Sequence, residues 1–254
     1  MKYGKFIYMK KQYTFDEFVE IVRLLRAPGG CPWDAEQTHE SIRNEFIEET
    51  YEAVDAIDNK NDTDLCEELG DVLLQILMHS QMAAEVGSFN VNDVINGVAE
   101  KMILRHPHVF GDVSVKNSDE VLINWEKIKR EEKSQHSFTD TLRSVPMAYP
   151  ALMRAQKVQK RYQKAGLSLG DKEKCLLALE NSFNKLKDAK EENFACAYGE
   201  FLFNAVALSA QYKTDSEEAL NKKTTAFINE FETFEEKAKL EASNIKDVIP
   251  TDFR

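Results

Sequence analysis

The sequence predicts an all-α protein, and three observations lead to this expectation. Only 10 glycines and 6 prolines interrupt 254 residues, so long stretches contain no residue that breaks a helix. Within these stretches, apolar residues recur three and four positions apart, which is the period of a helix face. The alternation of apolar and polar residues that marks a strand is absent. We therefore expect bundles of helices without a sheet.

Five helices are expected in the first half of the chain, each bounded by a capping residue or by a segment with proline and glycine. Their ranges are 14–26, 39–59, 63–85, 90–105 and 118–133. Two of the intervening segments, 27–34 and 105–112, contain proline, glycine and aromatic residues or histidines. Proline and glycine predict that 27–34 is not helical and that 105–112 ends the preceding helix.

The second half of the chain resembles a copy of the first. A constant shift of 129 positions places Gly70 on Gly199 and preserves the apolar rhythm of the residues around them. The length suits two modest domains, each large enough to bury a core. We expect a first domain over 1–132, a polar linker over 133–149 and a second domain over 150–254, which begins with a helix led by Pro150.

Composition limits where the protein acts and what it binds. A net charge of -11 disfavours nucleic acid and anionic membrane surfaces as partners, because both would be repelled. No segment resembles a secretory signal or reaches the length of a membrane span, so we expect a cytoplasmic protein. The four cysteines are far apart and form no CxxC pair, which indicates reduced thiols and not a disulfide frame or a zinc site; they are Cys31, Cys66, Cys175 and Cys196.

Two acidic motifs predict a metal site. In Glu48-Glu49-Thr50-Tyr51-Glu52 and Glu67-Glu68-Leu69-Gly70-Asp71, carboxylates three residues apart share one face of a helix. One such motif alone is typical of a solvated face. Two on successive helices, interleaved with apolar residues that must pack, place carboxylates where they need a partner.

If the two helices are antiparallel, four carboxylates converge on one point: Glu49, Glu52, Glu68 and Asp71. Oxygen ligands without cysteine or histidine favour Mg²⁺, or Mn²⁺, and such ions commonly serve phosphate substrates. Gly70 within this pattern costs about 1 kcal/mol relative to alanine in a helix, which suggests that a neighbouring helix or ligand approaches closely.

Other residues have both a binding and a structural interpretation. Lys101 and Arg105, four apart, would bind phosphate oxygens or form an ordinary solvated basic face. Trp33 would stack on a nucleobase or fill the domain core. His106 and His108 would carry protons or cap and pack a helix end.

The second copy lacks the acidic set. Under the same shift, the four carboxylates from Glu49 to Asp71 correspond in order to Ala178, Asn181, Ala197 and Glu200. We therefore expect one metal site per chain, in the first half.

Taken together, these motifs resemble the bacterial MazG family. The resemblance rests on the acidic motifs and on Gly30-Cys31-Pro32-Trp33-Asp34 with Gln37-Thr38, Arg105-His106-Pro107-His108-Val109-Phe110, Trp125-Glu126-Lys127-Ile128-Lys129 and the segment 152–161. It covers nearly all of the first half and continues into the second. The departure is the eroded acidic set of the second half, which members of the family can retain.

The resemblance implies tandem all-α domains in an intertwined homodimer and Mg²⁺-dependent cleavage of nucleoside triphosphates between the α and β phosphates, in the service of nucleotide-pool house-cleaning. It implies that Glu49, Glu52, Glu68 and Asp71 hold the metal, with Lys101 and Arg105 on the phosphates. Glu48 would orient or deprotonate the attacking water, and Trp33 would contact the substrate.

Two alternative functions belong to other classes of protein. Loss of one acidic set is compatible with a catalytically silent nucleotide-binding regulator. A di-iron carboxylate bundle typically uses two ExxH motifs, but only Glu36-Gln37-Thr38-His39 has that spacing, at the start of a helix, so this alternative is set aside.

Overall fold

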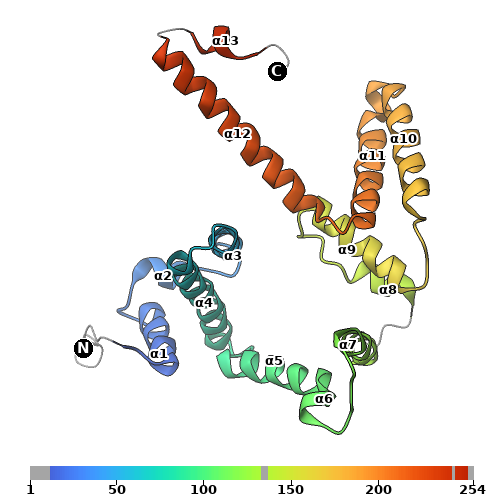
Figure 1. Ribbon diagram of the computed structural model, residues 1–254. Helices are drawn as coiled ribbons and strands as arrows, with labels where there is room; N and C mark the ends of the chain where they lie inside the picture. Colours follow the sequence, from blue (N-terminus) through green and yellow to red (C-terminus); the bar gives the residue numbers. More distant parts are fainter. Residues whose placement is uncertain (1–11, 133–136, 242–243, 251–254) are drawn as a thin grey trace. The chain divides into compact units, whose positions relative to one another are not determined.

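The structure is a computed structural model that describes residues 12–132, 137–241 and 244–250. All regular secondary structure within these residues is helical (Figure 1), which confirms the prediction of an all-α protein. The chain divides into two compact units, Met1–Lys129 and Arg130–Arg254. No helix in the described ranges has the length and apolar character needed to cross a membrane.

The first unit contains the five predicted helices, with ends that differ from the predicted ones by at most four residues, and two short helices that were not predicted. The helices are α1 Phe15–Arg26, α2 Pro32–Glu36, α3 Arg43–Asp58, α4 Asp62–Glu85, α5 Val91–Arg105, α6 Pro107–Phe110 and α7 Ser118–Glu132, whose last residues fall in the second unit. The prediction that 27–34 is not helical is wrong from Pro32 onward. Both α2 and α6 begin with proline, which is tolerated there because the first N–H groups of a helix have no intrahelical partner.

Side-chain caps define where the long helices begin. Thr14 accepts from the backbone N–H of Glu17, whose carboxylate accepts from the N–H of Thr14, which is a capping box at the start of α1. Asn61 accepts from the N–H groups of Thr63 and Asp64 and starts α4 three residues after α3 ends. Such a short connection makes α3 and α4 an antiparallel hairpin.

The core of the first unit lies between α1, α4 and the residue before α3. Its buried members are Val22, Ile42, Leu77, Met78 and Met82, with partly buried Phe18, Val19, Leu73, Leu74 and Val91 against them. Their burial removes apolar surface from water, which contributes about 25 cal/mol per Å². This core fixes the half of α4 that follows the acidic motif.

Many apolar residues on the hairpin are exposed. The sequence predicts that the apolar residues between the acids are packed, but Ile47, Tyr51, Val54 and Leu69 are between 45% and 54% exposed. This prediction is wrong within the single chain. The α5 helix has the same character, with exposed Val94, Ile95, Val98, Ile103 and Leu104. Helical periodicity shows that a face is apolar, but it does not show whether the same chain covers it.

The second unit contains the helices α8 Phe138–Arg143, α9 Ala151–Lys164, α10 Lys172–Lys187, α11 Glu191–Gln211, α12 Ser216–Leu240 and α13 Ile245–Val248. A shift of 129 carries both ends of α3 onto the ends of α10 and the first residue of α4 onto the first residue of α11. The hairpin is therefore repeated in the second unit with the predicted register.

The predicted linker, 133–149, is only partly described, since residues 133–136 lie outside the described ranges. Its remaining part contains α8, which packs against α9. Arg161 of α9 donates from Nη1 to the carbonyl oxygen of Thr141, at 2.7 Å, and to the hydroxyl of Ser144. This end of the predicted linker is thus tied to the second unit.

Candidate metal centre

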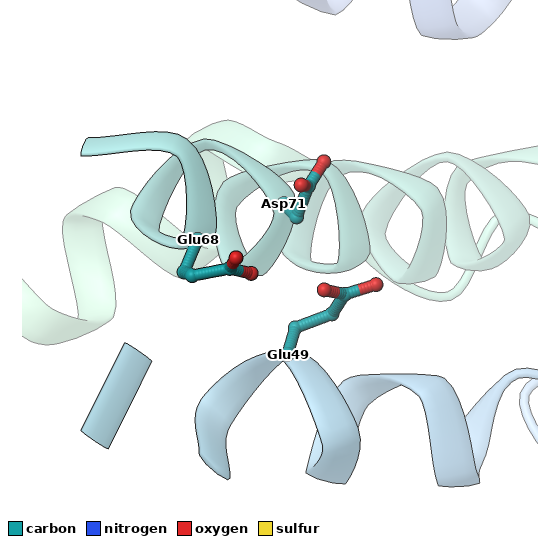
Figure 2. Close-up of side chains that lie close together, drawn as sticks. All are labelled: Glu49, Glu68 and Asp71. Carbon is teal, nitrogen blue, oxygen red and sulfur yellow. The ribbon is translucent and has the colours of Figure 1, made fainter. Parts of the chain in front are cut away.

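The α3–α4 hairpin brings the predicted carboxylates together. Glu49 projects from α3 toward Glu68 and Asp71 of α4 (Figure 2), and one oxygen from each lies within 4.8 Å of the others. The side chain of Glu52 lies within hydrogen-bonding distance of the side chain of Glu68. All four residues that the acidic motifs single out therefore meet at one place on the hairpin.

The electrostatics of the cluster are unfavourable without a cation. Burial is the largest cause that raises the pKa of Glu49 above its usual value, and the charges of Asp71, Glu52, Glu48 and Glu45 raise it further. The pKa of Glu68 is raised by desolvation first and then by Glu52, Asp71 and Glu49. The neighbouring carboxylates thus disfavour the ionised forms of Glu49 and Glu68.

The donor set fits a hard divalent ion. Three carboxylates with oxygens within 4.8 Å can contact one cation, and Mg²⁺ and Mn²⁺ prefer oxygen ligands. A dication would remove the mutual repulsion that raises the two pKa values. Glu49, Glu52, Glu68 and Asp71 are the residues that would hold it.

Of the two expectations for Gly70, the close approach of a neighbouring helix is wrong within this unit. A Cβ built on Gly70 meets no atom within 4 Å, so no described helix of this chain approaches there. The position beside Glu68 and Asp71 is open, so the close approach of a ligand stays a prediction.

The predicted substrate residues are not part of the carboxylate cluster. Trp33 lies on α2 and is 59% exposed, so the prediction that it fills the core is wrong. Lys101 is exposed on α5. The charges that shift the pKa values of Glu49 and Glu68 are all carboxylates and include neither Lys101 nor Arg105. Glu48 is exposed on α3 beside Glu49.

Arg105 belongs to a separate cluster with Trp125. Its side chain is 8% exposed, and its guanidinium carbon lies 5.2 Å from the centre of the Trp125 ring. His106 packs edge-on against the same ring at 4.9 Å, and its Nδ1 lies 2.6 Å from the carbonyl oxygen of Met102. These contacts show a packing role for His106, which was one of the two interpretations of that residue.

Two polar residues beside the cluster were missed by sequence reasoning. Glu45 lies four residues before Glu49 and Gln75 lies four residues after Asp71. Both positions fall on the helix faces that carry the acids. That spacing was the available signal, although neither residue belongs to an ExxE or ExxD motif.

The equivalent place in the second unit has a different chemistry. Glu200, which corresponds to Asp71, accepts from Nζ of Lys185 at 2.7 Å. The other three equivalent residues are Ala178, Asn181 and Ala197. An ammonium group therefore neutralises the one retained carboxylate, and these four positions offer no second cluster of oxygens.

The fold and the cluster together define an all-α protein with a carboxylate centre suited to a hard divalent ion. The family model for the MazG nucleotide pyrophosphohydrolase domain matches residues 37–110, which span α3 to α6 and include the whole cluster.

Full-length relatives extend this likeness. The chain is 41% identical over 223 residues to the nucleoside triphosphate pyrophosphohydrolase/pyrophosphatase MazG of Thermotoga maritima, covering 87% of this chain and 86% of the relative. It is 40% identical over 227 residues to the nucleoside triphosphate pyrophosphohydrolase of Escherichia coli K12, with the same coverage of 87% and 86%. YabN of Bacillus subtilis is 41% identical over 241 residues, and this chain spans 49% of its length.

The chain belongs to the MazG family of nucleoside triphosphate pyrophosphohydrolases, which are hydrolases that act on phosphoric anhydrides.

Proposed function

We propose that this protein is a Mg²⁺-dependent enzyme, for which Mn²⁺ can substitute, that cleaves ribo- and deoxyribonucleoside triphosphates between the α and β phosphates. The products would be a nucleoside monophosphate and pyrophosphate. The observation that supports this most directly is the convergence of Glu49, Glu68 and Asp71 within 4.8 Å in a chain of this family. Carboxylates that repel one another are suited to a cation that the triphosphate also needs.

In this mechanism the hairpin supplies a fixed set of oxygen ligands. A bound Mg²⁺ would neutralise triphosphate charge and align the attacking water. Glu49, Glu52, Glu68 and Asp71 would hold that ion from both helices. Glu48, exposed next to Glu49, accepts the proton of the water as its oxygen bonds to phosphorus and the bridging P–O bond breaks.

The substrate contacts support a homodimer. Glu85 follows Asp71 by 14 residues, which is about 21 Å along α4, and α5 continues away from that end of α4 and does not turn back along it (Figure 1). Lys101 and Arg105 would therefore reach the phosphates from a second copy. The exposed apolar residues of α3, α4 and α5 are suited to the interface between the two copies, and Trp33 would approach the base.

Mixed oligomers would test this arrangement. Glu49→Gln removes a metal ligand and Lys101→Ala removes a phosphate contact, so each variant alone is expected to be inactive. Co-refolded mixtures should regain pyrophosphate release if the two residues act from different copies. Failure of mixtures to regain activity, with a monomeric mass in sedimentation experiments, would rule out the shared site.

The net charge of -11 supports small nucleotides and not nucleic acid as ligands, because a polyanion would be repelled over its whole length. A role in house-cleaning of the cytoplasmic nucleotide pool would follow if the enzyme accepts several bases and sugars.

The decisive experiment is pyrophosphate release from a panel of ribo- and deoxyribonucleoside triphosphates with Mg²⁺. The intact protein should release pyrophosphate, Glu49→Gln should abolish release, and the matched Glu200→Gln change in the second unit should leave it unchanged. If the intact protein binds nucleotide but releases no pyrophosphate, it is the silent regulator, an alternative favoured by the replaced acidic set of the second unit.

A further inference from the structure

Two buried oxygens next to the carboxylate cluster lack a hydrogen-bond partner within the described part of the chain. They are Oε2 of Glu45 and Oε1 of Gln75. Gln75 is only 8% exposed. A buried acceptor without a donor costs about 1–3 kcal/mol, so these two atoms indicate a missing donor or cation.

Helix geometry places these two oxygens beside the cluster. On α3, Glu49 lies three residues before Glu52, and Glu45 lies four residues before Glu49. On α4, Asp71 lies three residues after Glu68, and Gln75 lies four residues after Asp71. In an antiparallel hairpin, residues reached by equal steps along the two helices lie opposite each other. The opposite pairs are Glu52 and Glu68, Glu49 and Asp71, and Glu45 and Gln75.

The next pair closes this row of facing residues. One further step of three residues along each helix places Ile42 opposite Met78. These two core residues are 2% and 4% exposed. Glu45 and Gln75 therefore lie at the inner end of the cluster, between the four carboxylates and the apolar core. The charge of Glu45 is close enough to contribute to the raised pKa of Glu49.

The charges of this row exceed what one ion neutralises. Glu45, Glu49, Glu52, Glu68 and Asp71 carry five negative charges when ionised, and one dication leaves about three of them uncompensated in a partly buried site. A water molecule could donate to both orphan oxygens, but it would leave that charge unchanged. A second dication satisfies the oxygens and reduces the charge as well.

We propose that Glu45 and Gln75 form a second binding position for a divalent cation, with Glu49 and Asp71 shared between it and the neighbouring ion. The inference rests on the proposed function for the first ion, and it adds a ligand pair that lies outside the acidic motifs. Oxygen ligands alone select Mg²⁺ or Mn²⁺. Ions on adjacent turns can act together on one triphosphate.

Binding of Mn²⁺ to the metal-depleted protein, without nucleotide, tests this site directly. Electron paramagnetic resonance of free Mn²⁺ should show two ions bound per chain of the intact protein. Glu45→Leu and Gln75→Leu should each reduce this number to one, while Gln75→Glu should keep two ions and tighten the weaker one. Asp58→Asn, on the outer side of α3, is the matched control and should retain two.

Two results would overturn the proposal. One is a single bound ion in the intact protein; the other is two ions in both Glu45→Leu and Gln75→Leu. Cooperative thermal unfolding of each metal-free variant checks that it is folded, and Gln75→Glu provides a gain of binding that a misfolded chain would not show.

Pyrophosphate release by the same intact protein separates this inference from the proposed function. Release with one bound ion rejects the second site alone, and two bound ions without release reject the catalytic function alone.

Discussion

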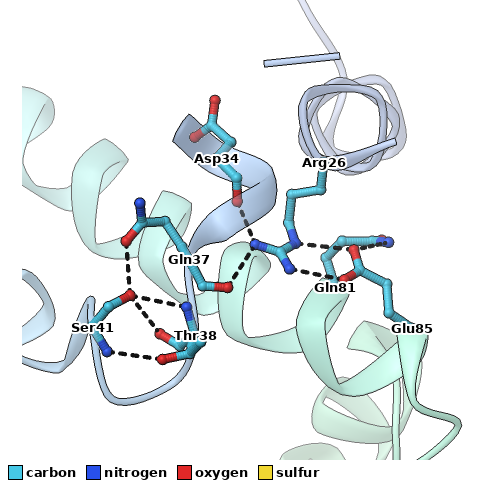
Figure 3. Close-up of polar contacts among 7 residues, drawn as sticks. All are labelled: Arg26, Asp34, Gln37, Thr38, Ser41, Gln81 and Glu85. Carbon is cyan, nitrogen blue, oxygen red and sulfur yellow. Dashed lines mark hydrogen bonds and ion pairs between the residues drawn. The ribbon is translucent and has the colours of Figure 1, made fainter. Parts of the chain in front are cut away.

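Arg26 and Glu85 form a two-pronged ion pair that joins the end of α1 to the end of α4. Nε and Nη2 of Arg26 donate to the two carboxylate oxygens of Glu85 at 2.9 and 2.8 Å (Figure 3). The Arg26 side chain is 5% exposed, and its Nη1 donates to the carbonyl oxygens of Asp34 and Gln37 at 2.5 and 3.1 Å. One guanidinium group therefore fixes α2, which carries Trp33, against α1 and α4.

Replacing Arg26 should destabilise the first unit substantially. Lysine cannot make the two-pronged pair and reach both carbonyl groups, so we expect Arg26→Lys to lower the free energy of unfolding by about 2–4 kcal/mol. Urea unfolding followed by tryptophan fluorescence measures this change. The matched control is Arg23→Lys, because Arg23 pairs with Glu20 where both side chains are about half exposed; it should cost about 0.5 kcal/mol or less. Equal losses for the two variants would contradict the role of Arg26.

The carboxylate cluster should make the metal-free protein less stable as pH rises. Glu49 and Glu68 have pKa values raised above the ordinary 4.5, so the folded state holds more protons than the unfolded state just above that pH. Stability therefore falls as pH increases from 4.5 through the raised values. Thermal unfolding in a chelator at pH 5 and pH 7 should show this decrease, and millimolar Mg²⁺ at pH 7 should reverse it. The double variant Glu49→Gln, Glu68→Gln should show a smaller decrease; an equal one would exclude the cluster as its cause.

The His39–His79 pair should give the opposite dependence at higher pH. Their Nδ1 atoms are 2.7 Å apart, so one ring donates and the other accepts, and two protonated rings would repel. Burial first, and then the charge of His39, lowers the pKa of His79 below the ordinary 6.5. The folded state binds fewer protons than the unfolded state below 6.5, so stability present above that pH is lost as pH falls through the lowered value.

Urea unfolding at pH 7.5 and pH 5.5 would measure the contribution of this pair. His39→Gln keeps a side chain that can hydrogen-bond with His79 and removes one titrating ring, so its loss of stability on acidification should be smaller than that of the intact protein. His108→Gln, which leaves the pair intact, should retain the full dependence on pH.

Trp33 should affect substrate affinity more than turnover. It is exposed on α2, and stacking of a base on an aromatic ring contributes about 1–3 kcal/mol. Trp33→Ala is therefore expected to raise KM by about fivefold or more with little change in kcat, and Trp33→Phe should recover most of the affinity. An unchanged KM for all nucleotides would remove Trp33 from the substrate site.

The sequence predicted the hairpin and its carboxylates because both depend on local rules. Apolar spacing defines α3 and α4, Asn61 caps the second of them, and residues three apart share a face whatever surrounds them. The same rules could not place Lys101 and Arg105 beside Glu49, since the position of α5 depends on packing over long range. They also could not show that Tyr51 and Leu69 are exposed within one chain, because periodicity identifies an apolar face and not the surface that covers it.

Glu45 and Gln75 were missed for another reason. Their importance lies in burial and in the absence of a described hydrogen-bond partner for Oε2 and Oε1, which a one-dimensional pattern does not contain. The beginning of α2 at Pro32 was missed because the prolines and glycines of 27–34 predict a loop, although proline is also common as the first residue of a helix. Both cases depend on which polar groups have hydrogen-bond partners, and the spacing of apolar residues does not contain this information.

The ion pair of Lys185 with Glu200 gives the two halves of the chain different responses to chelators. In the second unit the counter-charge is covalently part of α10, so it is present at any metal concentration. In the first unit the proposed counter-charge would come from solution, and a dication at 100 times its dissociation constant would add about 2.7 kcal/mol to folding. Magnesium depletion should therefore loosen the half that carries the carboxylates while the other half keeps its stability, and hydrogen exchange with and without chelator should show protection lost in α3 and α4 but retained in α10 and α11.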